Sequence, residues 1–347
     1  MTTINKVFQP PQGFSTANEL KTLSMPELYD TEFPTPKAII KDLLYPGLYI
    51  LAGAPKTGKS FLMAQLAYHI AQGQKLWNFD TQQGSVLYLA LEDKFYRLQQ
   101  RLVRMFDMEV SPKLHMAVSA QGLEEGLEAQ LASFIEKHPD IRLVIIDTLQ
   151  KIRGANDEKI NYARDYNTSS KLKAIADKHG ICLIVVHHTR KQQADDSFEM
   201  ISGSNGLFAA ADGGIILRKD KRLADKATLE FSGRDHADQL LSLNFERATC
   251  TWKLEKAACK SWQLPPDPVL EKVVSFVRNN DAPWCGTAQE LIDVLKLESV
   301  IKNNSLSRKI NTHKEQLWES YGIFTKRGRS GNDKTIELQY LPRKQAA

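Results

Sequence analysis

Residues 48–72 read LYILAGAPKTGKSFLMAQLAYHIAQ, and the eight letters GAPKTGKS at their centre, residues 53–60, decide the fold. The pattern of a phosphate-binding loop, G-x-x-x-x-G-K-[ST], is matched at Gly53, Gly58, Lys59 and Ser60. Glycines lack a Cβ, so successive backbone N–H groups can turn towards one anion, and the helix that follows adds the positive end of its dipole. The loop therefore predicts a site for a nucleoside triphosphate and its metal, formed by Gly53, Ala54, Pro55, Lys56, Thr57, Gly58, Lys59, Ser60 and Phe61.

The residues on either side supply the strand and the helix that a phosphate-binding loop requires. The apolar run 48–52 suits a buried strand, and residues 60–72 carry apolar side chains at helical spacing until Gly73 ends the helix. In such a loop Lys59 reaches the β- and γ-phosphates, and the Ser60 hydroxyl ligates Mg²⁺. The alternative, a glycine turn with an incidental lysine, leaves this order of strand, loop and helix unexplained.

The composition indicates an ordinary globular protein. The chain has 347 residues, of which 42% are hydrophobic and 25% charged, enough for a large core and a second, smaller domain. Its net charge of +5 permits a polyanionic partner without requiring one. The four cysteines lack metal-binding spacing, and no apolar run reaches the length of a membrane span or a signal segment. We therefore expect a soluble, cytoplasmic protein.

Four segments follow one another along the chain. Residues 1–45 are expected to form an arm or lead-in, and 46–262 alternate apolar strand-like runs with helical periodicity. Continuous apolar strands between helices predict an α/β fold, with a mostly parallel sheet covered by helices on both faces. The proline-rich stretch 263–268 predicts a linker, and 269–347 a smaller domain of helices followed by a β-hairpin.

Sequence patterns give bounds for several of these elements. Strands are expected at 86–91, 143–147, 181–188 and 213–219, and helices at 94–106, 166–178 and 269–278. In the smaller domain, Thr287 and Glu290 have the spacing of a capping box. A further helix over 305–322 is expected to begin at Ser305 and to end at Gly322.

Two carboxylates are expected at strand ends beside the loop. Asp147 closes LVIID, and P-loop enzymes hold Mg²⁺ with such an outer carboxylate. Glu92 follows the next predicted strand and could orient or deprotonate an attacking water, because parallel strands end at the same ligand-binding edge. The ordinary alternatives are capping of the next turn by Asp147 and helix N-terminal charge from Glu92.

A histidine and an arginine complete the expected site. His188 ends an apolar strand beside basic residues and is preferred to His187 as a hydrogen-bonding sensor of the γ-phosphate. Arg234, in LEFSGRD, is the candidate for an arginine supplied by a neighbouring subunit to stabilise the charge of phosphoryl transfer. Arg218 and Lys219 compete for that role, and an ion pair with a nearby acid is the alternative for Arg234.

The end of the chain is basic. Residues 302–347 hold ten Lys or Arg against four acids, a net +6 that exceeds the +5 of the whole chain. A basic helix and a basic hairpin suit duplex DNA, and protein docking is the alternative. Two polar loops, 151–164 and 190–206, could also contact a phosphate backbone. The candidate contacts of the basic tail are Arg308, Lys309, Lys314, Lys326, Arg327 and Arg329.

Several segments together resemble a RecA-like ATPase, most closely the RepA-like branch of hexameric replicative helicases of plasmids and mobile elements. The resemblance covers roughly residues 45–245 and rests on PGLYILAGAPKTGKSFLMAQLA, VLYLALED, LVIIDTLQ, VVHHTRK, ISGSNGLFAAADGGIILRK and GRD. It implies a homo-oligomeric ring, hexameric in that family, which binds ATP and Mg²⁺ between subunits and single-stranded DNA through the ring. The tail resembles a winged-helix domain.

The resemblance also implies roles for individual residues. Glu92 matches the catalytic glutamate, Asp147 the Walker B aspartate and His188 the polar sensor, and Arg234 falls near the place of the trans-acting arginine. Pro-Lys replaces glycine-richer letters in GAPKTGKS, and the loops after Asp147 and His188 are not clearly matched, which leaves DNA contact and translocation open.

These features favour an ATP-hydrolysing DNA motor of the helicase type. Two alternatives stay open. One is an ATP-dependent DNA-binding or recombination factor that does not unwind DNA, and the other is a regulatory ATPase whose tail docks on a protein. A metabolite kinase is disfavoured because the sequence has no pattern of a substrate-binding lid.

Overall fold

The chain divides into two units in the computed structural model, one formed by Pro36–Trp262 and the other by Met1–Thr35 together with Gln263–Ala347. The larger unit begins at Pro36, whereas the sequence suggested residue 46, because its core includes Ile39, Ile40, Leu43 and Leu44. The structure describes residues 20, 22–33, 36–153, 162–188, 205–219, 221, 224–234, 237–259, 267–280, 282–330 and 333–342.

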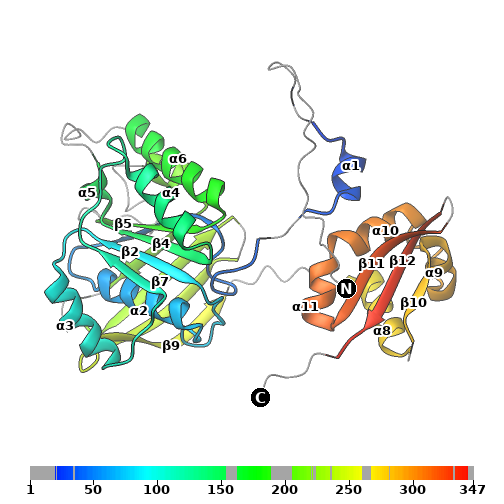
Figure 1. The fold of residues 1–347 in the computed structure, drawn as a ribbon. Coiled ribbons are helices and arrows are strands. Elements are labelled where there is room, and N and C mark those ends of the chain that lie inside the picture. The colour runs from blue at the N-terminus through cyan, green and yellow to red at the C-terminus, as the bar shows by residue number, and fades with distance from the viewer. Residues whose placement is uncertain are drawn as a thin grey trace. The chain divides into compact units, whose positions relative to one another are not determined.

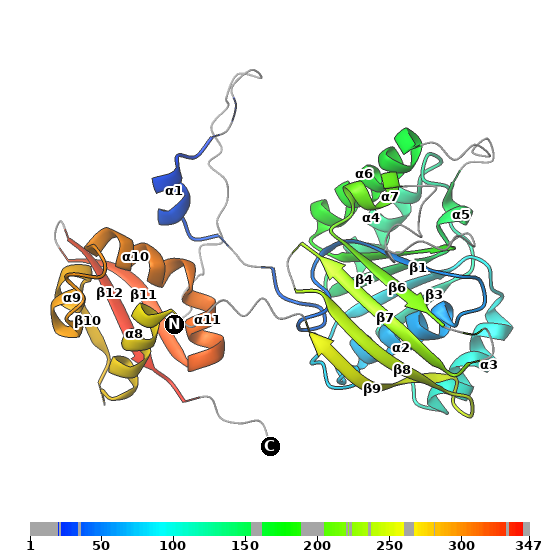
Figure 2. The same cartoon turned by 180° about the vertical axis from the view of Figure 1, so that it is seen from behind.

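The larger unit is built on one sheet. Its strands are β1 (Gly47–Gly53), β2 (Ser85–Ala90), β3 (Leu114–Ala117), β4 (Ile141–Asp147), β5 (Cys182–His188), β6 (Gly213–Arg218), β7 (Lys226–Gly233), β8 (Gln239–Glu246) and β9 (Thr251–Cys259). They lie in the order β3-β2-β4-β5-β1-β6-β7-β8-β9. The first six in this order pair in parallel, and β7, β8 and β9 continue the sheet with antiparallel pairing (Figure 2). The four predicted strands are confirmed to within two residues at each end.

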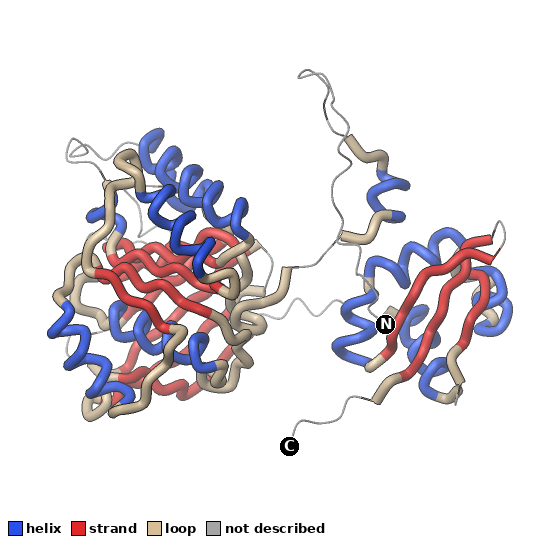
Figure 3. Tube along the Cα trace, in the orientation of Figure 1, coloured by secondary structure: helices blue, strands red, loops and turns tan. Residues whose placement is uncertain are grey.

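Helices cover both faces of this sheet, so the predicted α/β class is confirmed (Figures 1 and 3). They are α2 (Lys59–Gln72), α3 (Phe95–Phe106), α4 (Leu127–Lys137), α5 (Leu149–Ile152), α6 (Tyr162–His179) and α7 (Asn205–Ala210). Buried side chains of α2 and α3 belong to the core on one face, and those of α4, α6 and α7 to the core on the other. Across the described residues of both units, no helix has the length and apolarity needed to cross a membrane.

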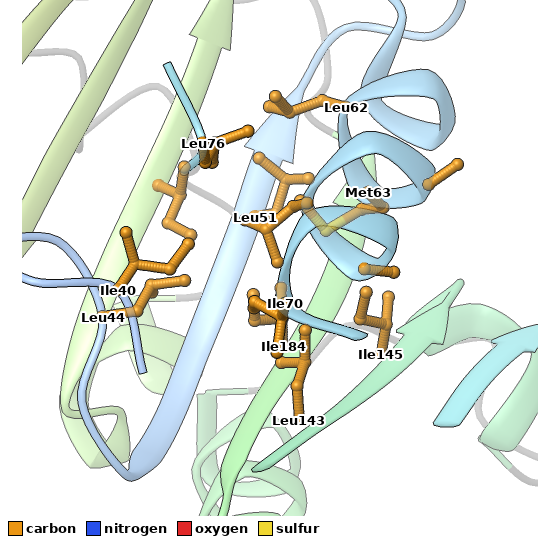
Figure 4. Packing of buried hydrophobic residues seen from close by; sticks show 14 of the residues in the cluster. Ile40, Leu44, Leu51, Leu62, Met63, Ile70, Leu76, Leu143, Ile145 and Ile184 are labelled. Atoms are coloured by element: carbon orange, nitrogen blue, oxygen red, sulfur yellow. The ribbon is translucent and has the colours of Figure 1, made fainter. Parts of the chain in front are cut away.

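Alternating side chains along β1 help to form a separate core on each face of the sheet. Tyr49 and Leu51 belong to the core on the α2 side, whereas Leu48 and Ile50 belong to the opposite core. Figure 4 shows α2 packed on β1, β4 and β5 through side chains that include Leu51, Leu62, Met63, Ile70, Leu143, Ile145 and Ile184. Trp252 of β9 joins the same core, so α2 packs against the antiparallel part of the sheet as well.

The smaller unit combines α1 (Met25–Asp30) with the end of the chain. Its other elements are α8 (Pro268–Arg278), β10 (Trp284–Thr287), α9 (Ala288–Leu295), α10 (Asn303–Thr312), α11 (Lys314–Tyr321), β11 (Ile323–Ser330) and β12 (Asp333–Tyr340). The three strands form an antiparallel sheet in the order β10-β12-β11. The short strand β10 was not predicted, because its four residues carry no alternation that could identify it.

The predicted helix over 305–322 is two helices in the structure. The backbone nitrogen of His313 lies 3.1 Å from the Lys309 carbonyl oxygen, and its ring Nδ1 lies 2.9 Å from the same oxygen. His313 is the C-cap of the first helix and has a non-helical backbone conformation. The first helix has its N-cap at Lys302, so the expected cap at Ser305 is wrong. Gly322 ends α11 as predicted, with φ 70°. The capping box of Thr287 and Glu290 is confirmed.

Candidate nucleotide site

The carboxyl ends of β1, β2, β4 and β5 meet at one edge of the sheet. The backbone register pairs Gly53 with His188, and Ala90 with Asp147. Glu92 follows Ala90 by two residues, so the loop, both predicted carboxylates and the predicted sensor lie along this edge. Open α/β sheets bind ligands at such an edge because the loops leaving parallel strands diverge there.

The loop itself has a backbone that only certain residues tolerate. Gly58 has φ 99°, and a Cβ added to it would lie 2.8 Å from Cζ2 of Trp252. Glycine is therefore required at this position both by conformation and by space. Lys56 also has a positive φ, 65°, and Thr57 closes the turn by donating its hydroxyl to the Ala54 carbonyl at 2.9 Å.

Lys59 is the cation of the site. Its side chain is 4% exposed, and its ammonium donates to the carbonyl oxygens of Gly53 and Ala54 at 2.8 and 2.9 Å. Burial lowers the pKa of Lys59 to about 8, and the charges of Asp147 and Glu92 oppose this shift. The positive charge of Lys59 is therefore buried away from water. A bound anion would stabilise this charge.

Each of the two carboxylates is fixed by one hydroxyl. Asp147 is buried and accepts a hydrogen bond of 2.8 Å from the hydroxyl of Tyr88, which also lies 3.4 Å from the Ser60 carbonyl oxygen. Burial and the Asp147 charge raise the pKa of Tyr88, so its hydroxyl remains a donor. Glu92 accepts a hydrogen bond of 3.0 Å from the Thr148 hydroxyl. Both acids are thus oriented before any ligand binds.

The donor set fits Mg²⁺ held together with phosphates. Among the described residues, no group of three or more His, Cys, Asp or Glu side chains could hold a metal ion without help. Mg²⁺ does not require one, because it usually takes one or two protein oxygens and fills its other positions with water and phosphate oxygens. The Ser60 hydroxyl at the start of α2 and the Asp147 carboxylate are oxygens of this kind.

The two histidines at this edge are both neutral at pH 7. Burial, with the nearby charge of Arg153, lowers the pKa of His187 to about 4. Burial and the charge of Lys59 lower the pKa of His188 as well, against Glu92 and Asp147. A neutral imidazole donates one hydrogen bond, so His188 can still act as the predicted donor. Most of the loops 151–164 and 190–206 lies outside the described residues.

Comparison with known proteins gives the family. Residues 15–194, just over half of the chain, match the family described as AAA domain (AAA_25). The chain belongs to the AAA domain family. None of the curated proteins compared with this sequence matches it.

Two solved structures resemble part of this chain. One, described as an "ATPase Domain", matches with a TM-score of 0.50 and 15% identity, over 61% of this chain and 85% of that chain. This likeness shows that the larger unit has the RecA-like fold. The structure of a "DnaB-Like Replicative Helicase And Its Interactions With Primase" matches with a TM-score of 0.49 and 17% identity, over 60% of this chain and 57% of that chain.

Arg234 lies at the opposite edge of the sheet of the larger unit. Its backbone N–H donates to the Asp212 carbonyl at 3.0 Å, and its guanidinium is 3.9 Å from the Asp212 carboxylate. The same carboxylate accepts the backbone N–H of Leu48, near the start of β1. The loop follows Gly53 at the other end of that strand, roughly 16 Å away. Arg234 therefore cannot contact a phosphate bound by its own loop.

Trp252 and Gln65 shape the phosphate-binding loop without belonging to any motif. The Trp252 indole donates to the Gly58 carbonyl at 3.3 Å. The Gln65 side chain on α2 accepts from the Trp252 N–H and donates to its carbonyl, at 2.8 and 2.9 Å. These contacts join positions almost two hundred residues apart, so no local sequence signal could reveal them.

Lys219 and Arg218, the competitors of Arg234, lie at the loop edge of the larger unit. The Lys219 ammonium is 5.0 Å from the centre of the Trp252 ring, which itself contacts the loop. Arg218 is ion-paired with Glu230. Their position beside the loop of their own chain differs from that of Arg234, so the three are not equivalent candidates.

The basic residues predicted in the tail separate into groups. Lys309 is ion-paired with Asp267, the N-cap residue of α8. Lys326 is on the face of β11 opposite to Arg327 and Arg329, because alternate strand residues face opposite ways. Lys334 of β12 lies opposite Arg329 of β11 in the strand register, and we add it to the four predicted residues that remain. We call these five residues the basic face: Arg308, Lys314, Arg327, Arg329 and Lys334.

Proposed function

We propose that this chain is an ATP-hydrolysing, DNA-associated motor of the RepA-like replicative helicase type, acting as a ring of identical subunits. One observation carries the proposal. Loop, lysine and acids meet at one edge of the sheet, whereas Arg234 lies at the other edge. A second copy can bring its Arg234 to the first copy's loop, and a head-to-tail contact of this kind generates rings. The hexamer follows the family resemblance.

The side chains at the edge divide the work of hydrolysis. Lys59 and the backbone of the loop hold the phosphates, and Ser60 with Asp147 would hold Mg²⁺, which neutralises phosphate charge when bound. Glu92, oriented by Thr148, takes a proton from the attacking water. His188 donates a hydrogen bond to the γ-phosphate, and the neighbour's Arg234 stabilises the charge that develops. Loss of the γ-phosphate changes the contact between two subunits, which gives the motor its movement.

The smaller unit provides the proposed contact with duplex DNA, while single-stranded DNA passes through the ring. Its order of helix, strand, helices and hairpin supports a winged-helix domain. In such domains a helix enters the major groove and the hairpin contacts phosphates. The basic face on α10, α11 and the hairpin suits that arrangement.

One observation favours a second candidate. Residues of α1 already occupy the basic face, so the smaller unit does hold a peptide segment. A regulatory ATPase whose tail docks on proteins would use the same face. Strand displacement and DNA binding separate this candidate from the motor.

The first experiment measures ATP hydrolysis by the purified chain with and without single-stranded DNA, beside Lys59→Ala and Glu92→Gln. We expect hydrolysis stimulated by DNA and absent from both variants, with nucleotide binding kept in Glu92→Gln. Hydrolysis that is indifferent to DNA would contradict the motor. A strand-displacement assay then separates a helicase from an ATP-dependent DNA-binding or recombination factor.

The shared site has its own test. Arg234→Ala and Lys59→Ala should each abolish hydrolysis alone. Mixed in equal amounts, they should recover activity, because about one quarter of the interfaces then combine an intact loop with an intact arginine. Matched mixing of Lys59→Ala with Glu92→Gln should recover nothing, since both residues belong to the same side of the interface. Failure of the first mixture to recover would contradict the role of Arg234.

A further inference from the structure

An acidic segment from the start of the chain lies on the basic face of the smaller unit. Helix α1 lies beside α10 (Figures 1 and 2). An Asp30 carboxylate oxygen is 3.2 Å from Nε of Arg308, and the other is 3.9 Å from Nζ of Lys334. Glu32 is 3.1 Å from Nζ of Lys314. We call residues 24–32 the acidic segment.

Backbone oxygens of the acidic segment bind the same face. Arg327 donates to the Asp30 carbonyl at 3.2 Å, and Asn311 donates to the Tyr29 carbonyl at 3.2 Å. Asp30, Arg327, Arg329 and Lys334 together line a hollow of about 430 Å³. Anionic and carbonyl oxygens are thus arranged along a row of Arg and Lys donors, as phosphate oxygens are along a protein that binds DNA.

The segment is held by charge and hydrogen bonds with little apolar burial. No residue of α1 is buried, and Met25 and Leu28 are 64% and 50% exposed. Ser24 and Glu27 form a capping box, but an isolated helix of six residues is only marginally stable in water, so its hydrogen bonds depend on docking to the basic face. Exposed ion pairs of this kind are individually weak and are screened by salt. The contact can therefore be displaced by a stronger polyanion.

We propose that the acidic segment and the DNA backbone compete for the basic face, so that the chain's own N-terminal region limits DNA binding by the smaller unit. The donors of Arg308, Arg327 and Lys314 cannot serve both ligands at once. The proposal rests on the proposed duplex interface. Binding of DNA releases the acidic segment, and residues 24–32 then become available to contact another surface.

The test is DNA affinity of the full chain carrying Asp30→Asn and Glu32→Gln, measured by fluorescence anisotropy with a short duplex. At low salt we expect roughly three- to tenfold tighter binding than wild type, because the three ion pairs of the competitor with Arg308, Lys334 and Lys314 are lost. The ratio should approach one as salt rises, since salt releases the segment from wild type. Equal affinity of the double variant and wild type at low salt would overturn the competition.

The matched control is Glu271→Gln with Glu298→Gln, which changes the net charge of the smaller unit by the same amount. The described contacts include no ion pair of either residue with the basic face. Its affinity should stay close to wild type. An equal gain in the control would show a general charge effect and overturn the proposal.

Hydrogen exchange distinguishes a failure of the proposed competition from a failure of the proposed duplex interface. In wild type without DNA, the amides of Leu28 and Thr31 are hydrogen-bonded within the segment, and we expect their protection to fall as salt rises. Adding duplex DNA at low salt should also lower the protection of these two amides, because DNA displaces the acidic segment. Protection unchanged by bound DNA would refute the competition. Absence of DNA binding by every variant, with salt-dependent protection intact, would instead refute the duplex interface.

Discussion

Proton uptake on nucleotide binding tests the buried ammonium of Lys59 directly. With a pKa of about 8, Lys59 is partly neutral in the free protein at mildly alkaline pH. The neutral fraction is about 0.1 at pH 7, 0.5 at pH 8 and 0.9 at pH 9. A bound triphosphate favours the charged ammonium and raises this pKa, so each binding event takes up that fraction of a proton. Affinity should fall as pH rises above 8, by up to about tenfold per unit.

The assay is titration calorimetry with a non-hydrolysable ATP analogue and Mg²⁺, in pairs of buffers that differ in ionisation enthalpy. The slope of the observed enthalpy against the buffer enthalpy gives the protons taken up at each pH. His187 and His188 do not contribute, because their pKa values are lowered and both are neutral in this window. Lys59→Met is the control and should show no uptake at nucleotide concentrations that saturate it. Uptake that stays near zero from pH 7 to 9, or persists in Lys59→Met, would refute the reasoning.

Three further outcomes follow from the contacts around the loop and in the smaller unit. Tyr88→Phe removes the donor to Asp147, and we expect a several-fold higher Mg²⁺ concentration for half-maximal hydrolysis, with about 1.5 kcal/mol lost in urea unfolding; an unchanged Mg²⁺ dependence would contradict this. Gly58→Ala places a Cβ against Trp252 at a positive φ and should abolish nucleotide binding measured by calorimetry. Binding as tight as wild type would show that the loop can change its conformation to accept a Cβ. Thr287→Ala should lower the stability of α9 by about 1 kcal/mol, seen as faster hydrogen exchange there and not in α2.

The loop edge could be predicted from sequence because its information is local. The spacing of GAPKTGKS and the position of Asp147 at the end of an apolar strand are both visible in a few letters. Parallel strands then place Glu92, Asp147 and His188 at one edge without any further knowledge of the fold.

The position of Arg234 could not be predicted in this way. It follows β7, which pairs antiparallel to β6, and the end of an antiparallel strand lies at the opposite edge of the sheet. Nothing in the letters of 226–233 shows the direction of the strand. The Trp252 contact with the loop and the Asp30 contact with Arg308 are equally hidden, because each joins residues from distant parts of the chain.

The break at His313 has a different cause. Leu306, Ile310 and Leu317 keep the spacing of one continuous helix, and all three are buried. The pattern of apolar residues reports which side faces the core, and it does not report that a side chain competes for a backbone carbonyl within the helix. At the Lys309 carbonyl, the His313 ring nitrogen and the His313 backbone N–H both lie within hydrogen-bonding distance.

The pairing of Gln65 with Trp252 also protects the last strand of the large sheet. An edge strand presents free N–H and carbonyl groups to which another extended chain can add, which promotes aggregation. At Trp252 these groups are already occupied, since Gln65 bonds both and Trp77 donates a second bond of 2.8 Å to the carbonyl. One glutamine on the phosphate-loop helix thus serves both the shape of the candidate nucleotide site and the protection of the sheet edge at Trp252.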